Sequence, residues 1–203
     1  LPDMIVVHYT GMQTAEAALE RLCDPVAEVS AHYLICERGR VFHMVDEAER
    51  AWHAGAGQWG PVTDVNSRSI GIELDNDGAS PFAAALMDAL DQLLPGILSR
   101  WSIPPQGVIG HSCMWPGRKS YPGPRFDWRR LARQGLAVWP ETRATAPVDS
   151  QRFRADALAY GFPDLTDNDL LGATRLRFRP NAAGPLDGCD CAIMAEMAAR
   201  FGA

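Results

Sequence analysis

Two histidines follow apolar segments in a way that could place a metal site. His8 follows the β-branched run 4–7, and His111 follows the run 108–110; small or polar residues come next in both cases. Ligands on the ends of adjacent strands point into one crevice. Two histidines with a third ligand and one open position make the usual catalytic zinc site. The alternative is that the two histidines are unrelated polar strand ends.

A carboxylate and an ammonium could complete such a site. Glu73 lies in the apolar segment 69–74, where a carboxylate needs a partner or a chemical role. It could act as a general base on a metal-bound water, or it could face outward from an alternating strand. Lys119 lies in the Pro- and Gly-containing segment 116–120. It could stabilise the oxyanion of a tetrahedral intermediate, or it could be a solvated surface charge.

The apolar pattern predicts an α/β fold, with a mixed central β-sheet flanked by helices and a small all-α C-terminal module after it. Strands alternate with helices along the first two thirds of the chain, which is typical of this class. Strands are expected at 4–8, 33–36, 41–45, 69–74 and 108–111. Helices are expected at 14–23 with Thr14 as N-cap, within 81–101, and at 128–135.

Composition shifts divide the chain into three parts. Residues 1–139 form the predicted α/β domain, and residues 140–149 form a linker of Pro, Thr and Ala without hydrophobic periodicity. Residues 150–203 are helical in composition and read as about three short helices. A module of this size has marginal stability alone. We therefore expect it to dock onto the first domain.

Charge and cysteine content exclude several classes of protein. The net charge of −6 argues against nucleic-acid binding, which requires a basic face. No apolar run reaches the roughly 18 residues of a membrane helix. The five cysteines have no regular spacing, so they do not form a disulfide framework. A monomer is the expected state.

Five segments carry a recognisable set of motifs in a fixed order. They are VHYT at 7–10, VSAHYLI at 29–35, AWHAG at 51–55, SIGIEL at 69–74 and GHSCMWPGRKSYPGPRFDW at 110–128. The set resembles the zinc-dependent type-2 N-acetylmuramoyl-L-alanine amidases, whose fold is shared by phage-lysozyme amidases and peptidoglycan recognition proteins. The resemblance covers residues 4 to about 130.

The resemblance implies a reaction and a role for four residues. His8 and His111 would bind Zn²⁺, Glu73 would act as acid and base on the zinc-bound water, and Lys119 would polarise the scissile carbonyl. The implied activity is hydrolysis of the amide bond between the N-acetylmuramoyl lactyl group and L-alanine. The implied substrate is peptidoglycan or a muropeptide.

The same resemblance implies substrate contacts and a second binding element. Trp52 and His53 would line the substrate groove, with His32 beside it. Residues 152–201 are similar, more weakly, to the helical peptidoglycan-binding module that follows some of these amidases. Such a module favours the cell envelope or periplasm, whereas unpaired cysteines favour the cytoplasm.

One loop departs from the family pattern. The third zinc ligand of the family is Asp, or Cys in some branches, and Tyr121 occupies that position here. Tyrosine could bind zinc only as a phenolate, and its unperturbed pKa is about 10. Cys113 replaces another Asp of the family and is a possible substitute ligand, because zinc favours thiolates. Two hypotheses follow: a zinc amidase with a substitute ligand, and a catalytically impaired, non-hydrolytic peptidoglycan-binding homologue.

Overall fold

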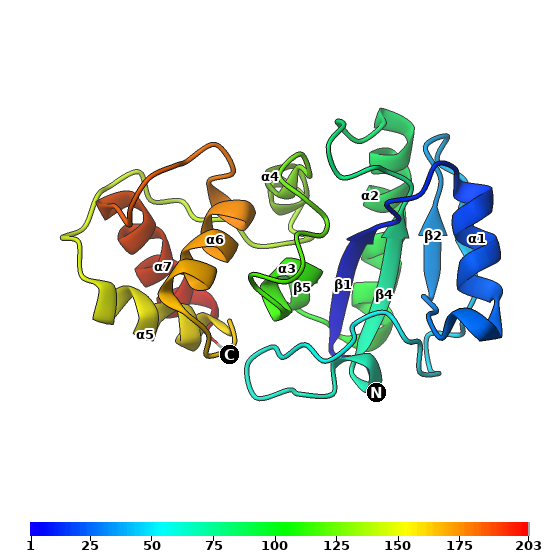
Figure 1. The fold of residues 1–203 in the computed structure, drawn as a ribbon, viewed down its shortest axis with the longest axis horizontal. Helices are drawn as coiled ribbons and strands as arrows, with labels where there is room; N and C mark the ends of the chain where they lie inside the picture. The colour runs from blue at the N-terminus through cyan, green and yellow to red at the C-terminus, as the bar shows by residue number, and fades with distance from the viewer. Residues whose placement is uncertain (203) are drawn as a thin grey trace.

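A computed structural model describes residues 1–202 of the chain. Its centre is a five-stranded sheet with the order β3-β2-β4-β1-β5 (Figure 1). The strands are β1 (Met4–Tyr9), β2 (Tyr33–Ile35), β3 (Val41–His43), β4 (Ser69–Leu74) and β5 (Val108–Gly110). β2, β4, β1 and β5 run parallel, and β3 pairs antiparallel with β2. The predicted mixed sheet is therefore confirmed.

One face of the sheet packs against helix α2 (Ala84–Trp101). Alternate residues of β1 and β4 supply this face, because successive strand side chains point to opposite sides. The residues that meet here are Ile5, Val7, Ile70, Ile72 and Leu74 from the strands and Leu86, Leu90, Leu94 and Ile97 from the helix. The predicted helix in 81–101 thus begins at Ala84 and continues through Pro95.

Helix α1 (Ala15–Cys23) begins where the sequence predicts. The Thr14 hydroxyl accepts a hydrogen bond from the Ala17 N–H at 3.1 Å, which satisfies a free donor of the first turn. Two short helices follow β5: α3 (His111–Met114) starts directly at His111, and α4 (Trp128–Arg133) starts after the Gly/Pro-rich loop. No helix in residues 1–202 has both the length and the apolar character needed to cross a bilayer.

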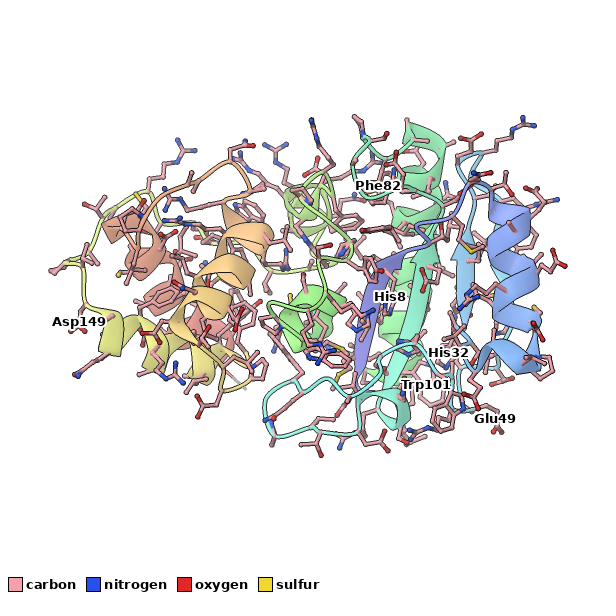
Figure 2. All side chains as sticks on the ribbon, viewed as in Figure 1. His8, His32, Glu49, Phe82, Trp101 and Asp149 are labelled. Atoms are coloured by element: carbon pink, nitrogen blue, oxygen red, sulfur yellow. The ribbon has the colours of Figure 1, made fainter. Side chains whose placement is uncertain are left out.

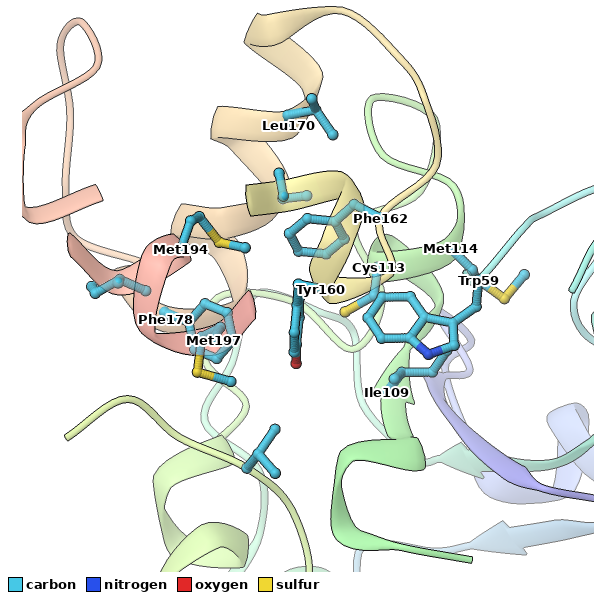
Figure 3. Packing of buried hydrophobic residues seen from close by; sticks show 14 of the residues in the cluster. Trp59, Ile109, Cys113, Met114, Tyr160, Phe162, Leu170, Phe178, Met194 and Met197 are labelled. Atoms are coloured by element: carbon cyan, nitrogen blue, oxygen red, sulfur yellow. The ribbon is translucent and has the colours of Figure 1, made fainter. Parts of the chain in front are cut away.

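The C-terminal residues fold into three helices, α5 (Ser150–Tyr160), α6 (Asp167–Phe178) and α7 (Gly188–Phe201), as predicted. They share a hydrophobic core with the opposite face of the sheet, and Tyr160 lies at its centre (Figure 3). The Tyr160 ring lies 5.3 Å from Trp59, 5.5 Å from Phe162 and 5.9 Å from Phe178. The three helices therefore pack directly against the sheet domain.

The segment that joins the two parts is extended but tied down. The Glu196 carboxylate on α7 accepts hydrogen bonds from the backbone N–H groups of Glu141 and Thr142, at 2.8 and 2.7 Å. The Ala146 N–H donates to the Gly188 carbonyl at 2.9 Å. These bonds hold part of the predicted linker against α7. The exact boundaries at 139 and 149 stay predictions.

Because the core is shared, we expect the chain to unfold as one unit. Tyr160→Ala removes an aromatic side chain that is 1% exposed, and it should cost about 3–5 kcal/mol of unfolding free energy. Urea denaturation followed by both tryptophan fluorescence and far-UV circular dichroism would measure this. Two separate unfolding transitions, of which Tyr160→Ala shifts only one, would show that the two parts unfold independently and would contradict the shared core.

Candidate active site

A pocket of about 270 Å³ opens at the carboxyl ends of β1, β4 and β5. In open α/β sheets, ligands bind in the crevice at this edge. The strand register puts His8 opposite Glu73 and Val7 opposite Gly110, so His111 lies just beyond its strand. The pocket brings together seven of the nine residues predicted from sequence: His8, Trp52, His53, Glu73, His111, Lys119 and Tyr121.

The rings of His8 and His111 face each other with their Nδ1 atoms. Their Nδ1 atoms are 3.0 Å apart, and the two side chains are almost completely buried. Burial lowers the pKa of His8 well below its usual value, and His111, His53 and Lys119 add to the effect. Burial, followed by the Lys119 charge, lowers the pKa of His111 to about 4. Both imidazoles are therefore neutral at pH 7, which a metal ligand requires.

A hydrogen-bond chain behind His8 fixes which of its nitrogens carries the proton. The Ser69 hydroxyl donates to the Val65 carbonyl at 2.6 Å, so its oxygen must accept from His53 Nε2 at 3.2 Å. Burial lowers the pKa of His53 to about 3, and a neutral imidazole has a single N–H. His53 Nδ1 therefore accepts from His8 Nε2 at 3.0 Å. The lone pair of His8 Nδ1 is left facing His111.

Two residues make room for His53 and hold it. A Cβ atom at Gly71 would lie 2.4 Å from the His53 ring, so the ring can pack on β4 only because residue 71 is glycine. The Asn66 side-chain oxygen accepts hydrogen bonds from the backbone N–H groups of His53 and Ala54, at 3.0 and 2.8 Å. These contacts fix the loop that carries His53 against the sheet.

Glu73 is held in its uncharged form by its surroundings. Burial raises its pKa to about 8, and the Lys119 charge opposes this shift without cancelling it. Its Oε2 atom is buried and has no hydrogen-bond partner within residues 1–202. A perturbed carboxyl with a free oxygen in a pocket can take up or release a proton near neutral pH.

Lys119, the only lysine in the sequence, lines the pocket together with a second cationic side chain, Arg21. Its Nζ lies 5.3 Å from the centre of the Tyr121 ring. The charge is close enough to lower the pKa of His8, His111 and Glu73. Lys119 is partly buried and lines the pocket.

Tyr121, which the sequence resemblance predicts to stand at the third-ligand position, lines the pocket. Its ring packs edge-on against Tyr9 at 4.3 Å and lies 5.8 Å from the His111 ring. Its carbonyl accepts a hydrogen bond from the Ser112 N–H at 2.9 Å, which ties the loop to α3. Burial, Tyr9 and Glu73 raise the pKa of Tyr121 above its usual value. Without a bound cation, this phenol is neutral at pH 7.

Two predicted site residues do not reach the pocket. His32 is fully buried beside β4 (Figure 2), where its Nδ1 accepts from the Gly71 N–H at 2.9 Å and its Nε2 donates to the Glu49 carbonyl at 3.1 Å. It ties two segments together, and its ring lies 5.8 Å from that of His53, so it sits beside the pocket without lining it. Cys113 lies in the core shared with the C-terminal helices (Figure 3), and burial raises its thiol pKa. It is not placed to replace Tyr121.

Sequence reasoning missed Ser69, Asn66 and Tyr9. Ser69 and Asn66 act through His53, which is 16 and 13 residues away in sequence, and no spacing rule connects them. Tyr9 directly follows His8, and its packing against Tyr121 depends on a loop that begins a hundred residues later. Its position at a predicted strand end was the one available signal.

Comparisons with known proteins agree with this geometry. The family model described as N-acetylmuramoyl-L-alanine amidase (Amidase_2) matches residues 1–124. N-acetylmuramoyl-L-alanine amidase AmiD of Escherichia coli K12 is 32% identical, covering 98% of this chain and 83% of the relative. The 1,6-anhydro-N-acetylmuramyl-L-alanine amidase AmpD of Enterobacter cloacae is 32% identical over 64% of this chain and 79% of its own length.

Solved structures extend the likeness to the whole chain. The structure of Escherichia coli AmiD in complex with anhydro-N-acetylmuramic acid-L-Ala-D-γ-Glu-L-Lys matches with a TM-score of 0.91 and 33% identity, over 99% of this chain and 90% of AmiD. Pseudomonas aeruginosa AmpDh3 matches with a TM-score of 0.84 and 29% identity, over 98% of this chain and 92% of its own. From the family match, the coverage and the shared fold, the chain belongs to the N-acetylmuramoyl-L-alanine amidase family.

Proposed function

We propose that this protein hydrolyses the amide bond between the lactyl group of N-acetylmuramic acid and L-alanine in peptidoglycan or muropeptides. The observation that carries the proposal is the convergence of two neutral imidazoles, a buried carboxyl group and one lysine in a single pocket. The structural relatives AmiD and AmpDh3 are described in complexes with an anhydromuramyl tripeptide and an anhydromuramic pentapeptide. A peptidoglycan substrate also supports a place in the cell envelope.

The pocket fits a zinc ion at His8 and His111. Two nitrogens that share a tetrahedral zinc at roughly 2.0–2.1 Å lie about 3.3 Å apart, and the two Nδ1 atoms are 3.0 Å apart. Within residues 1–202, no three His, Cys, Asp or Glu side chains are grouped to hold a metal. We therefore propose Tyr121 as the third ligand, with weaker affinity than a carboxylate would give. Bound zinc would polarise the amide carbonyl and lower the pKa of a water molecule.

The protein's own side chains supply the proton transfers and the charge stabilisation. A cation bound beside Glu73 would favour its ionised form, because opposite charge stabilises a carboxylate. Ionised Glu73 would then take a proton from the attacking water through Oε2 and return it to the nitrogen of the leaving L-alanine. The Lys119 ammonium stabilises the negative charge that develops on the carbonyl oxygen. Trp52, 57% exposed at the rim, offers an indole face for the substrate.

The role of Glu73 is tested by Glu73→Gln. This change keeps the shape of the side chain and removes the proton acceptor, so turnover should fall by about 10²–10⁴-fold. Release of the stem peptide from purified muropeptides, followed by chromatography, measures it. Glu20→Gln, on the exposed face of α1, is the matched control. A Glu73→Gln rate within threefold of the parent rate would refute the assignment.

The role of Tyr121 is tested by two substitutions with opposite expectations. Tyr121→Asp supplies an anionic ligand and should tighten zinc binding by about tenfold or more, whereas Tyr121→Phe removes the oxygen and should weaken it by at least as much. Zinc content after desalting and muropeptide hydrolysis are both measured.

The neutral phenol of Tyr121 also motivates a second candidate function, a non-hydrolytic peptidoglycan-binding homologue. That function predicts a parent protein without zinc or activity and a Tyr121→Asp variant that gains both. Equal zinc content in the parent and Tyr121→Phe would instead show that the phenol is not a ligand.

The hydrogen-bond chain behind His8 is tested by Ser69→Ala. Without the hydroxyl, nothing directs the His53 proton to Nε2, so His53 and His8 should populate both tautomers. The ¹⁵N chemical shifts of the histidine rings in zinc-free protein report this directly, and zinc affinity should fall by about 10–100-fold. Ser80→Ala, in an exposed loop, is the control. Ring ¹⁵N shifts identical to those of the parent would show that the hydrogen bonds through Ser69 and His53 do not set the tautomer of His8.

A further inference from the structure

A second groove, with a volume of about 710 Å³, lies between α4 and the end of α7, and residues 135–143 form its third wall. It is remote from the pocket described above. Pro105, in the short 3₁₀ turn η3 (Pro105–Gly107) that leads into β5, lines the groove, whereas the pocket opens beyond the other end of β5. The groove and the pocket thus lie toward opposite ends of the same strand.

The groove gathers arginines that have no acidic partner. Arg129, Arg133 and Arg143 line it, and none of them forms a salt bridge with any residue in 1–202. Most other arginines of the chain are paired with Asp or Glu. The single acidic residue of the groove, Glu141, is held by Arg200 at 2.9 Å. This cluster is notable in a chain whose net charge is −6.

Trp139 and Phe201 give the groove an apolar floor. Trp139 is partly buried, and its ring packs edge-on against Phe178 at 5.8 Å. Phe201 lies beneath Arg200, with 4.7 Å between the guanidinium carbon and the ring centre. Hydrogen bonds from Glu141 and Thr142 to Glu196 fix the backbone of the wall. A cationic rim over such a floor suits a ligand that bears carboxylates next to less polar surface.

We propose that this groove binds the carboxylates of peptidoglycan stem peptides at a distance from the catalytic pocket. The identity of the polymer rests on the proposed function. The muramyl peptide bound to AmiD contains a γ-linked glutamate, and that linkage leaves the α-carboxylate free. Guanidinium groups recognise carboxylates with two parallel hydrogen bonds. Three arginines without competing acidic partners can offer this recognition without first breaking a salt bridge.

A second site would allow the protein to bind a peptidoglycan strand at two points. Stem peptides recur along glycan strands, so one can occupy the groove while another enters the pocket. Simultaneous attachment makes the second contact intramolecular and raises the effective concentration of scissile bonds. Retention on insoluble peptidoglycan would then depend on the groove, and hydrolysis of a small soluble muropeptide would not.

The test compares single charge reversals of equal size. In a Glu73→Gln background, which leaves the polymer intact, Arg133→Glu and Arg143→Glu should each weaken co-sedimentation with insoluble peptidoglycan by about threefold. The triple variant Arg129→Gln, Arg133→Gln, Arg143→Gln should weaken it by about tenfold. Arg125→Glu is the matched control, because Arg125 is exposed, outside the groove and in no salt bridge within the described chain. Thermal melting checks that each variant is folded.

Competitors and activity separate the possible outcomes. The soluble peptide L-Ala-γ-D-Glu-L-Lys should displace the protein from the polymer, and inorganic phosphate at the same ionic strength should not. Equal retention of the triple variant and the control, or equal displacement by phosphate, would overturn the proposal. With Glu73 restored, the triple variant should hydrolyse soluble anhydromuropeptide within twofold of the parent rate. Absence of hydrolysis in the parent itself would count against the proposed function, and arginine-dependent retention would still be measurable.

Discussion

The pocket depends on one constraint, which is that its histidines stay uncharged while packed against each other. Burial achieves this for His8, His53 and His111, whose pKa values all fall below the usual range of histidine. The same dry environment keeps a proton on Glu73 at neutral pH. A dication bound in this pocket would find neutral nitrogens and one carboxyl group that can ionise beside it.

The C-terminal helices pack against the short helix that carries His111. Helix α3 carries His111 toward the pocket, and its residues Cys113 and Met114 are part of the core that α5, α6 and α7 complete (Figure 3). On the same side, the buried Arg177 guanidinium stacks on Trp128 at 3.7 Å and donates to the Val138 carbonyl at 3.0 Å. The position of one pocket histidine is therefore linked to the packing of helices that never reach the pocket.

The fold and the main pocket residues could be read from sequence because the information is local. An apolar run along 69–74 and an apolar stripe in 81–101 indicate the strand and the helix, and strand ends mark His8 and His111. The role of His32 and the hydrogen-bond chain through Ser69 could not be read, because they depend on which distant loop covers Gly71. The sequence also could not show that Cys113 faces the core and not the pocket. It lies two residues after His111 on a four-residue helix, where the direction of a side chain changes within one turn.

The single lysine of this chain has a practical meaning. Every other fixed side-chain cation is a guanidinium, so Lys119 carries the only side-chain primary amine in the protein, and it lines the pocket. Amine-selective acylation, which does not touch arginine, would thus label the α-amino group of the chain and one side chain, Lys119, where substrate is expected to bind. A probe could therefore be attached in the pocket of the protein without introducing a residue for labelling.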